Sequence, residues 1–425
     1  MVASKPSALA QAIYRREIIP WTLLGLTLGL VESATAAILV KHQFAGVASP
    51  LAVNIAVGLA SGASALSNVV SFIWANLAHG RERVPIMVAL QVIFSLLVGV
   101  VALAPTSAGG LVMTVLAIMA ARALWAGILT IRSAIWGANY PRNVLATMTG
   151  RIVVISSLTI ALSAMGVGWA MQSGALDARW LYASATMAGL IGAYTYRQTR
   201  VRREFRMLAE EGAAGRGSEA FSLRIVTNIL KEDPSFRQYM FWLGLFGGGN
   251  LMLIAQLVVI CSEQLHLSSG IQILMLSVVP LVTLPFFTPT WARLFDGSHT
   301  VVYRSRQGWT LVAAAVVLCA GAFIGWLPLM WMGAIILGAA NAGANLGWNL
   351  GHNDFASLGR AQHYMGVHVT LTGVRGAIAP PVGILVYEGL EAWQSGWGRF
   401  SLILPVAMTT AGTLGFNLMR KALEK

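Results

Sequence analysis

The chain has 425 residues, of which 56% are hydrophobic and 11% are charged, and its formal net charge is +13. A typical soluble domain is about a quarter charged, so this composition excludes an ordinary soluble globular protein. A strongly basic balance is typical of nucleic-acid binding or of membrane topology, and the positions of the charges distinguish the two.

Apolar residues form long blocks, without the alternation that is typical of strands. A helix needs about 20 apolar residues to cross a ~30 Å hydrocarbon core. Backbone groups in lipid must be hydrogen-bonded within their own segment, so helices are the only interpretation. The sequence therefore predicts an all-α integral membrane protein with twelve transmembrane helices, of which the sixth is the weakest candidate. The expected spans are 18–39, 51–76, 85–104, 111–135, 152–172, 180–196, 238–261, 271–293, 308–325, 328–350, 368–387 and 399–419.

The positive charges are distributed asymmetrically along this pattern. If the N-terminus is cytoplasmic, all but six of the 29 Lys and Arg residues fall in cytoplasmic segments. The exceptions are Lys41, Arg179 and Arg399 on the outer side and Arg122, Arg132 and Arg375 within spans. This asymmetry predicts cytoplasmic N and C termini and a multi-pass protein of the cell (inner) membrane. The basic residues then indicate topology and attraction to anionic membrane lipids, and we expect no nucleic-acid partner.

One long polar segment, residues 197–237, interrupts the apolar blocks and divides them into six plus six. It predicts an N-terminal six-helix bundle (1–196), a basic cytoplasmic linker (197–237) and a C-terminal six-helix bundle (238–425). The Gly-rich middle of the linker is typical of a flexible connection. Residues 221–230 fit a short amphipathic helix that lies on the membrane surface.

An internal repeat relates the two halves. After the second span of each half come "WANLAHGRERV" from Trp74 and "WARLFDGSHTVVYR" from Trp291, in which Trp, Ala, Leu and Gly recur at matching offsets. At the end of the fourth span of each half come "WGANYPRN" from Trp136 and "WNLGHNDF" from Trp348. Two bundles of the same pseudo-symmetric design are therefore expected.

This 6+6 arrangement, with its basic central loop and charged turns after helices 2 and 8, resembles the major facilitator superfamily (MFS) of transporters over about residues 17–420. In that family the turn reads roughly Gly-x-Leu-Ala-Asp-Arg-x-Gly-Arg-Arg. Leu294, Asp296 and Gly297 keep the core of the pattern in the second half, whereas His79 and Gly80 replace the aspartate and the arginine in the first. The aspartate helps to close one face of the transporter in the family, so the first half departs from the usual gating arrangement.

The resemblance implies transport by alternating access, in which two bundles rock about a midplane site. By the same resemblance, residues in the cytoplasmic turns are candidates for gating. Asp354, where the chain leaves the membrane after helix 10, is expected to pair with Arg360 or to cap helix 11, and so to act as a gate. The candidate gating residues are His79, Arg81, Asp296, Arg304, Asp354 and Arg360.

Ionisable residues inside spans are the first candidates for function, because a charge near the bilayer centre is costly unless it faces water or a partner. Glu32 lies in helix 1 and Arg122 in helix 4, at similar expected depths. We expect the two to pair, with protonation of Glu32 coupled to transport and Arg122 stabilising its ionised form. The alternative is a static ion pair that only orients the two helices.

Arg375 lies near mid-depth in helix 11, and His368 and Thr372 share its helical face. We expect this stripe to face the cavity, with Arg375 and His368 as substrate-binding candidates. Two arginines against one glutamate favour an anionic solute. The alternative is an arginine satisfied by backbone carbonyls of helix 10. Pro380 and Pro381 in the same span predict a kink or a break.

Asparagines and glycines recur every four residues in helix 10, so one face carries amides and a neighbouring face a groove. The groove, made of Gly343, Gly347 and Gly351, permits close approach of another helix. The amide face provides two substrate-binding candidates, Asn341 and Asn345, which join Asn250 and Gln256 of helix 7 and Arg122 of helix 4. For any single polar residue, an interhelical hydrogen bond is the competing interpretation.

The sequence favours a secondary active transporter of a small organic, preferably anionic, solute that is driven by protons through Glu32 and acts as a monomer. It contains no motif for a cofactor, a metal site or an ATP-driven motor, and we expect no enzymatic activity and no catalytic residue. Two rival hypotheses remain: a receptor or scaffold protein of the same fold that does not transport, and a membrane-embedded hydrolase that uses His352 and Asp354. Substrate identity, direction and the choice among symport, antiport and uniport stay open.

Overall fold

The computed structural model describes residues 8–140, 142–174, 177–214, 223–356 and 360–424, and all regular elements in these ranges are helical. The first half contains α1 (Ala8–Gly29), α2 (Ser33–Gln43), α3 (Pro50–Leu66), the 3-10 turn η1 (Ser67–Val70), α4 (Ser71–Ala78), α5 (Arg83–Leu103), α6 (Ala108–Asn139), α7 (Arg142–Ser173) and α8 (Ala178–Tyr196). The linker contains α9 (Glu204–Ala214) and α10 (Leu223–Glu232). The second half contains α11 (Pro234–Glu263), α12 (Ser269–Ile273), the π-helical η2 (Leu274–Val278), α13 (Val279–Asp296), α14 (Thr300–Ile324), α15 (Leu327–Leu350), η3 (Gly351–Asp354), α16 (Ala361–Trp393), η4 (Trp397–Leu402) and α17 (Ile403–Leu423).

Eleven helical segments of the described chain are long and apolar enough to cross a membrane, and they coincide with eleven of the twelve expected spans. The remaining block, 180–196, forms α8, which is not among the eleven. The all-α membrane architecture is thus confirmed, while the count of twelve crossings stays a prediction. The described part of the short amphipathic segment lies in α10, and the Gly-rich middle of the linker from residue 215 onward lies outside the described residues.

Helix starts follow local capping rules. Asp233 accepts a hydrogen bond from the backbone N–H of Phe236 at 2.8 Å, with Pro234 as the first helical residue of α11. Ser49 caps α3 in the same way and is also followed by a proline, Pro50. A capping oxygen satisfies one of the free N–H groups at a helix start, and proline there sacrifices no hydrogen bond.

The first expected span is not one helix. α1 ends at Gly29 and α2 begins at Ser33, with Glu32 in an extended conformation at the N-cap position. This corrects the prediction of a continuous helix over 18–39. The break depends on distant contacts: the Ser33 hydroxyl donates to the Ser61 carbonyl at 2.8 Å, and Glu32 pairs with Arg122. Interrupted helices of this kind place helix ends and polar groups at mid-membrane.

α16 runs without interruption through Pro380 and Pro381, so the helix does not break there, and a kink stays a prediction. Proline removes the hydrogen bond to the carbonyl four residues earlier, which for Pro380 is that of Gly376. α3 of the first half lies directly against this carbonyl, because a Cβ built on Gly62 would be 2.5 Å from it. Packing against α3 therefore covers the position where the helix is weakened.

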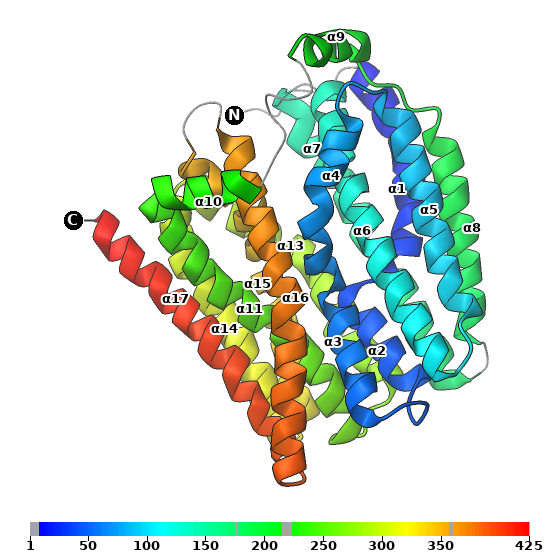
Figure 1. Cartoon of the computed structure of the whole chain (residues 1–425), viewed down its shortest axis with the longest axis vertical. Helices are drawn as coiled ribbons and strands as arrows, with labels where there is room; N and C mark the ends of the chain where they lie inside the picture. The colour runs from blue at the N-terminus through cyan, green and yellow to red at the C-terminus, as the bar shows by residue number, and fades with distance from the viewer. Residues whose placement is uncertain (1–7, 141, 175–176, 215–222, 357–359, 425) are drawn as a thin grey trace.

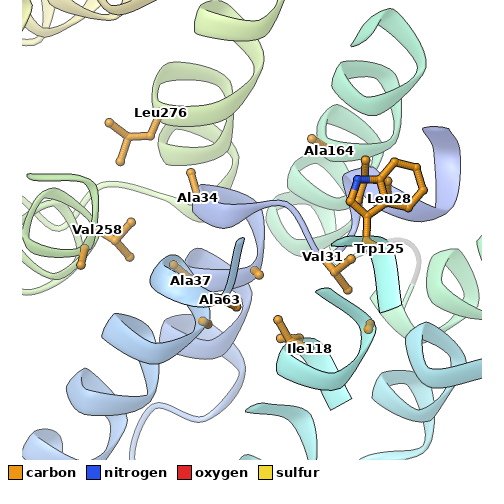
Figure 2. Packing of buried hydrophobic residues seen from close by; sticks show 14 of the residues in the cluster. Leu28, Val31, Ala34, Ala37, Ala63, Ile118, Trp125, Ala164, Val258 and Leu276 are labelled. Atoms are coloured by element: carbon orange, nitrogen blue, oxygen red, sulfur yellow. The ribbon is translucent and has the colours of Figure 1, made fainter. Parts of the chain in front are cut away.

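The two halves stand side by side, and they meet along α3 and α16 (Figure 1). Small residues make this approach possible: a Cβ built on Gly376 would lie 2.5 Å from that of Ala65. A second meeting place joins α7 to α12, where Gly168 lies close to Gly270. Figure 2 shows the buried alanines of α2 and α3 with Val258 and Leu276 of the second half beside them, so one apolar core extends across both halves.

α1 begins and α17 ends toward the upper end of the view in Figure 1, whereas α2 ends and α3 begins at the opposite end. We call this opposite end of the bundle, which also holds the last turns of α11 and α16, the far end.

Candidate functional site

A small cavity of about 180 Å³ lies between the halves. Its walls come from the start of α2 in the first half and from α11, η2, α13 and α15 in the second. Its polar lining residues are Glu32, Ser33, Asn250, Ser277 and Asn341, and the other lining residues are apolar. A mostly apolar pocket with a few convergent polar groups is the usual form of a small-molecule site.

Glu32 and Arg122 form the ion pair that the sequence predicted. The carboxylate Oε2 lies 3.1 Å from Nη1 of Arg122, and the Glu32 and Arg122 side chains are 26% and 9% exposed. Arg122 comes from α6, so the pair joins the interrupted first span to the fourth. The carboxylate also stands at the start of α2, where the positive end of the helix dipole stabilises negative charge.

Asn250 and Asn341 face Glu32 across the same cavity, from α11 and α15 respectively. The side-chain Oδ1 of Asn250 is buried and accepts no hydrogen bond from any described residue. Buried polar atoms without a partner are rare in folded proteins, and one in a cavity wall is a ready acceptor for a bound molecule. The predicted candidates Glu32, Asn250 and Asn341 are therefore brought together by the fold.

Arg375 lies elsewhere. Its guanidinium donates to the Leu243 carbonyl and to the Thr372 hydroxyl, each at 2.8 Å, and it borders a groove between α11, α16 and α17 instead of the inter-half cavity. Leu243, whose carbonyl accepts from Arg375, lies in α11, the seventh expected span. The alternative interpretation, in which carbonyls of the tenth span (α15) bind Arg375, is therefore also wrong. The packing of helix 7 makes this possible, since Gly247 leaves room for the guanidinium to cross the helix backbone.

The other polar candidates are also outside the cavity lining. Gln256 is fully buried, and its side-chain nitrogen donates to the Gly383 carbonyl at 2.9 Å and to the Ser401 carbonyl at 3.2 Å. His368 is 1% exposed and packs edge-on against Trp348. Asn345 is exposed on α15, and its backbone carbonyl accepts from Asn349. Gln256 and His368 are thus packed within the second half, whereas Asn345 lies on an exposed face of α15, and a substrate-binding role for these three residues stays a prediction.

The glycine groove of helix 10 is a packing surface for α14. A Cβ on Gly347 would be 2.6 Å from the Arg304 guanidinium carbon, and a Cβ on Gly343 would be 2.7 Å from Gln307. Arg304 is accordingly buried within the second half, where it donates to Gln307 at 3.0 Å. Arg304 therefore lies inside a bundle and not in the exposed turn from which its gating role was inferred.

The remaining gating candidates are dispersed. The Asp354 carboxylate accepts from the backbone N–H of Thr300 at 2.6 Å and so stabilises the start of α14, while Arg360 pairs with Glu232 at 2.8 Å. The structure thus corrects the expectation that Asp354 pairs with Arg360 or caps helix 11. His79 is half-buried at the end of α4, whereas Arg81 and Asp296 are exposed. Their gating roles stay predictions.

Sequence reasoning missed a polar cluster at the far end, made of Lys41, Asn54, Glu263, Tyr387 and Glu388, which we call the far-end cluster. Lys41 is 8% exposed and donates to Asn54 Oδ1 at 2.5 Å and to the Glu263 carboxylate. Asn54 Nδ2 donates to Glu263 at 2.9 Å and to Glu388, and the Tyr387 hydroxyl donates to Glu263 at 2.7 Å. The sequence did contain a signal for this cluster. Lys41 closely follows the first expected span, and Glu263 and Glu388 closely follow two spans of the second half that end on the same side of the membrane.

A second missed group lies near the middle of α1. Glu17 is fully buried, and its carboxylate accepts from the Trp136 indole at 2.8 Å and from the Tyr140 hydroxyl at 3.0 Å. The Arg132 guanidinium lies 4.3 Å from the ring centre of Trp136. This group joins α1 to α6 within the first half. The sequence contained a signal for it, because Glu17 and Arg132 are opposite charges at the expected cytoplasmic ends of the first and fourth spans.

The overall structure is similar to solved membrane transporters. The nucleoside transporter NupG matches with a TM-score of 0.71 at 12% identity, over 96% of this chain and 99% of that one. The xylose transporter XylE from E. coli, in a partially occluded inward-open conformation, matches with a TM-score of 0.66 at 13% identity, over 96% and 97%. The human organic anion transporter MFSD10 matches with a TM-score of 0.59 at 16% identity, over 97% and 98%.

No protein-family model and no curated protein sequence matches the chain. These three structural matches cover nearly the whole chain, and each of them is a transporter. Together with the helical repeat and the membrane-spanning segments, they show that the chain has the fold of the major facilitator superfamily transporters.

Proposed function

We propose that the chain is a proton-coupled secondary active transporter that moves a small polar solute by alternating access. The observation that carries the proposal is the Glu32–Arg122 ion pair at the break between α1 and α2, on the wall of a cavity between the halves. A titratable carboxylate at the meeting place of two mobile bundles can sense both the proton and the solute.

The surroundings of Glu32 support proton coupling. Its carboxylate is paired with Arg122 at the start of α2 and borders a largely apolar cavity. Protonation would break the ion pair and remove the tie between α2 and α6. Because the same carboxylate borders the cavity, solute binding and proton binding act on one group.

The chemistry of the cavity favours a solute with hydrogen-bond donors and no net negative charge. Glu32 and the Asn250 carbonyl oxygen are acceptors, and Arg122 is engaged by Glu32. The sequence favoured an anionic solute because it placed both Arg122 and Arg375 in the cavity, but Arg375 borders a different groove. A nucleoside transporter and a D-xylose–proton symporter are among the proteins of similar fold, and their named solutes carry hydroxyl groups. An organic anion transporter is also among them, so anions belong in any test.

Alternating access requires closure at one end while the other is open. The far-end cluster supports closure at the far end, because it joins α2 and α3 of one half to α11 and α16 of the other. His42 adds a contact to Gln272 at 3.0 Å in the same region. We propose that solute release at the far end requires the Lys41–Glu263 ion pair to open.

Uptake into proteoliposomes tests the proposal. The panel pairs neutral pentoses and nucleosides with monocarboxylates, each measured with and without an imposed pH gradient. Wild type should accumulate a neutral solute against its gradient only when the pH gradient is present. Glu32→Gln should lose uphill accumulation and keep counterflow exchange, whereas Glu424→Gln, a change of an exposed carboxylate at the end of α17, should behave as wild type.

Three outcomes decide among the hypotheses. Uphill transport by Glu32→Gln equal to wild type would exclude coupling through this residue. Transport of carboxylates alone would exclude the neutral solute. No flux of any solute by folded protein would favour the receptor or scaffold alternative.

A further inference from the structure

A second hollow of about 640 Å³ lies on the outside of the second half, between α11, α16 and α17. α11 lies between the diverging α16 and α17 (Figure 1). The hollow is separate from the inter-half cavity, because the two share no lining residue. Its lining is almost entirely apolar, and Phe241 and Ile378 are exposed there.

The floor of this groove is smooth because α11 carries glycines one turn apart. A Cβ built on Gly244 would meet no atom within 4 Å, and one on Gly248 would meet only the end of the Met408 side chain at 3.2 Å and the Ala379 side chain at 3.8 Å. A large side chain at either position would occupy the groove. The shape therefore suits one long, flexible apolar chain.

The groove runs from one charged end into the membrane. Its lining extends along α11 from Arg237, in the first turn, to Met252. Fifteen residues at 1.5 Å each make this ~22 Å, more than the ~15 Å depth of one leaflet in a ~30 Å core. α10, an amphipathic helix whose Leu230 also lines the groove, marks the membrane-surface level at the Arg237 end.

Arg237 supplies the charge that selects the occupant. It is exposed, its guanidinium donates to the Leu230 carbonyl at 3.2 Å, and it forms no ion pair with any described residue. The neighbouring acids are engaged elsewhere: Glu232 pairs with Arg360, and Asp233 caps α11 and accepts from Tyr364. A guanidinium has five N–H donors, so donors remain for an anionic headgroup.

We propose that this groove binds one anionic phospholipid, with its phosphate on Arg237 and an acyl chain along Gly244 and Gly248. An apolar groove with a single cation at surface level matches the charge and the length of such a lipid. A bound acyl chain would also cover α11 on the side opposite the inter-half cavity, and so link the lipid composition of the leaflet to the helix that carries Asn250.

The test uses the purified full chain in detergent with two probes that have the same acyl chains: palmitoyl-oleoyl-phosphatidylglycerol and palmitoyl-oleoyl-phosphatidylcholine. Native mass spectrometry measures lipid retention, and the thermal unfolding midpoint is followed in parallel. Gly244→Leu fills the groove at a position with open space. Gly389→Leu is the matched control, because Gly389 also has open space around its Cβ but lies outside the groove.

Wild type and Gly389→Leu should retain one phosphatidylglycerol in preference to phosphatidylcholine. Arg237→Gln should reduce retention of phosphatidylglycerol roughly fivefold, since a basic residue near the membrane surface contributes about 1 kcal/mol to binding of anionic lipid. Gly244→Leu should lose retention of both lipids while its unfolding midpoint without lipid stays near that of wild type.

Equal retention by Gly244→Leu and wild type would overturn the groove as the site. Equal retention of the two lipids by wild type would overturn the anionic headgroup. Dimers that dissociate on Gly244→Leu substitution would show that a second copy of the chain, instead of a lipid, occupies the groove. None of these outcomes depends on transport, so a failure here is distinct from a failure of the proposed function.

Discussion

The Glu32 carboxylate lies 3.1 Å from the Arg122 guanidinium at the point where the first span is interrupted. Neither residue alone defines the site. The break directs Glu32 at the cavity, and Arg122 of α6 compensates its charge from the other side.

Removal of Arg122 should be more harmful than removal of the whole pair. Arg122→Gln leaves a carboxylate without its cation at mid-membrane, and breaking a buried pair costs up to about 3–5 kcal/mol, less here because Glu32 is partly exposed. Glu32→Gln/Arg122→Gln should therefore unfold at a higher temperature than Arg122→Gln alone, as measured by thermal unfolding in detergent. Equal midpoints for Arg122→Gln and the double variant would contradict this prediction, because they would show that the unpaired Glu32 carboxylate does not destabilise the protein.

Loss of Lys41 should open the far end. Lys41→Met leaves Glu263 and Asn54 without their cation, so the closed state is destabilised relative to the open one. In a background without Cys261 and Cys319, the cavity substitution Ser277→Cys should react about tenfold faster with a membrane-impermeant thiol reagent added at the far end, which corresponds to ~1.4 kcal/mol. Lys421→Met, which changes a lysine in the last turn of α17, is the control and should leave the rate unchanged.

A bulky residue in the glycine seam should stop transport without unfolding either half. Gly376→Leu places side-chain atoms where Ala65 and Leu66 of α3 now lie, and overpacking of this kind costs about 1–3 kcal/mol. We expect transport to be lost and the reactivity of Ser277→Cys from the far end to rise, because the halves are forced apart. Gly389→Leu in the same helix has open space and should transport normally. Normal transport by Gly376→Leu would contradict a role for this close approach.

Asn250 and Gln256 lie on the same helix and should behave differently. Asn250→Ala removes an acceptor from the cavity wall and should raise the KM for the solute, with little change in stability. Gln256→Ala removes the side-chain donor to the Gly383 and Ser401 carbonyls and should lower stability by about 1–2 kcal/mol, with an unchanged KM. Uptake kinetics and thermal unfolding of both variants distinguish the two roles. A raised KM for Gln256→Ala would indicate that Gln256 contacts the solute.

The amino-acid sequence by itself determined the membrane class, the positions of eleven spans and the resemblance of the fold to that of transporters. These properties follow from hydrophobic length and from repeated local motifs, which do not depend on distant contacts. The Glu32–Arg122 pair was also predictable, because two opposite charges in lipid at similar depth have few alternatives to each other. The helix 10 groove was predictable for a related reason, since residues four apart share a helix face.

For the polar residues other than Glu32 and Arg122, only the tertiary structure decided which of them meet. Arg375, Gln256 and Asn250 are all polar residues within expected spans, and the sequence does not distinguish their roles. In the structure Arg375 crosses α11 at Gly247, Gln256 binds the Gly383 carbonyl and Asn250 lines the cavity. The far-end cluster joins residues more than two hundred positions apart, such as Lys41 and Glu263. The break before α2 depends on Ser61 and Arg122, which no local pattern contains. The physical reason is the same in each case: a buried polar group is satisfied by whatever packing brings to it, and that packing is set by the relative rotation and approach of whole helices.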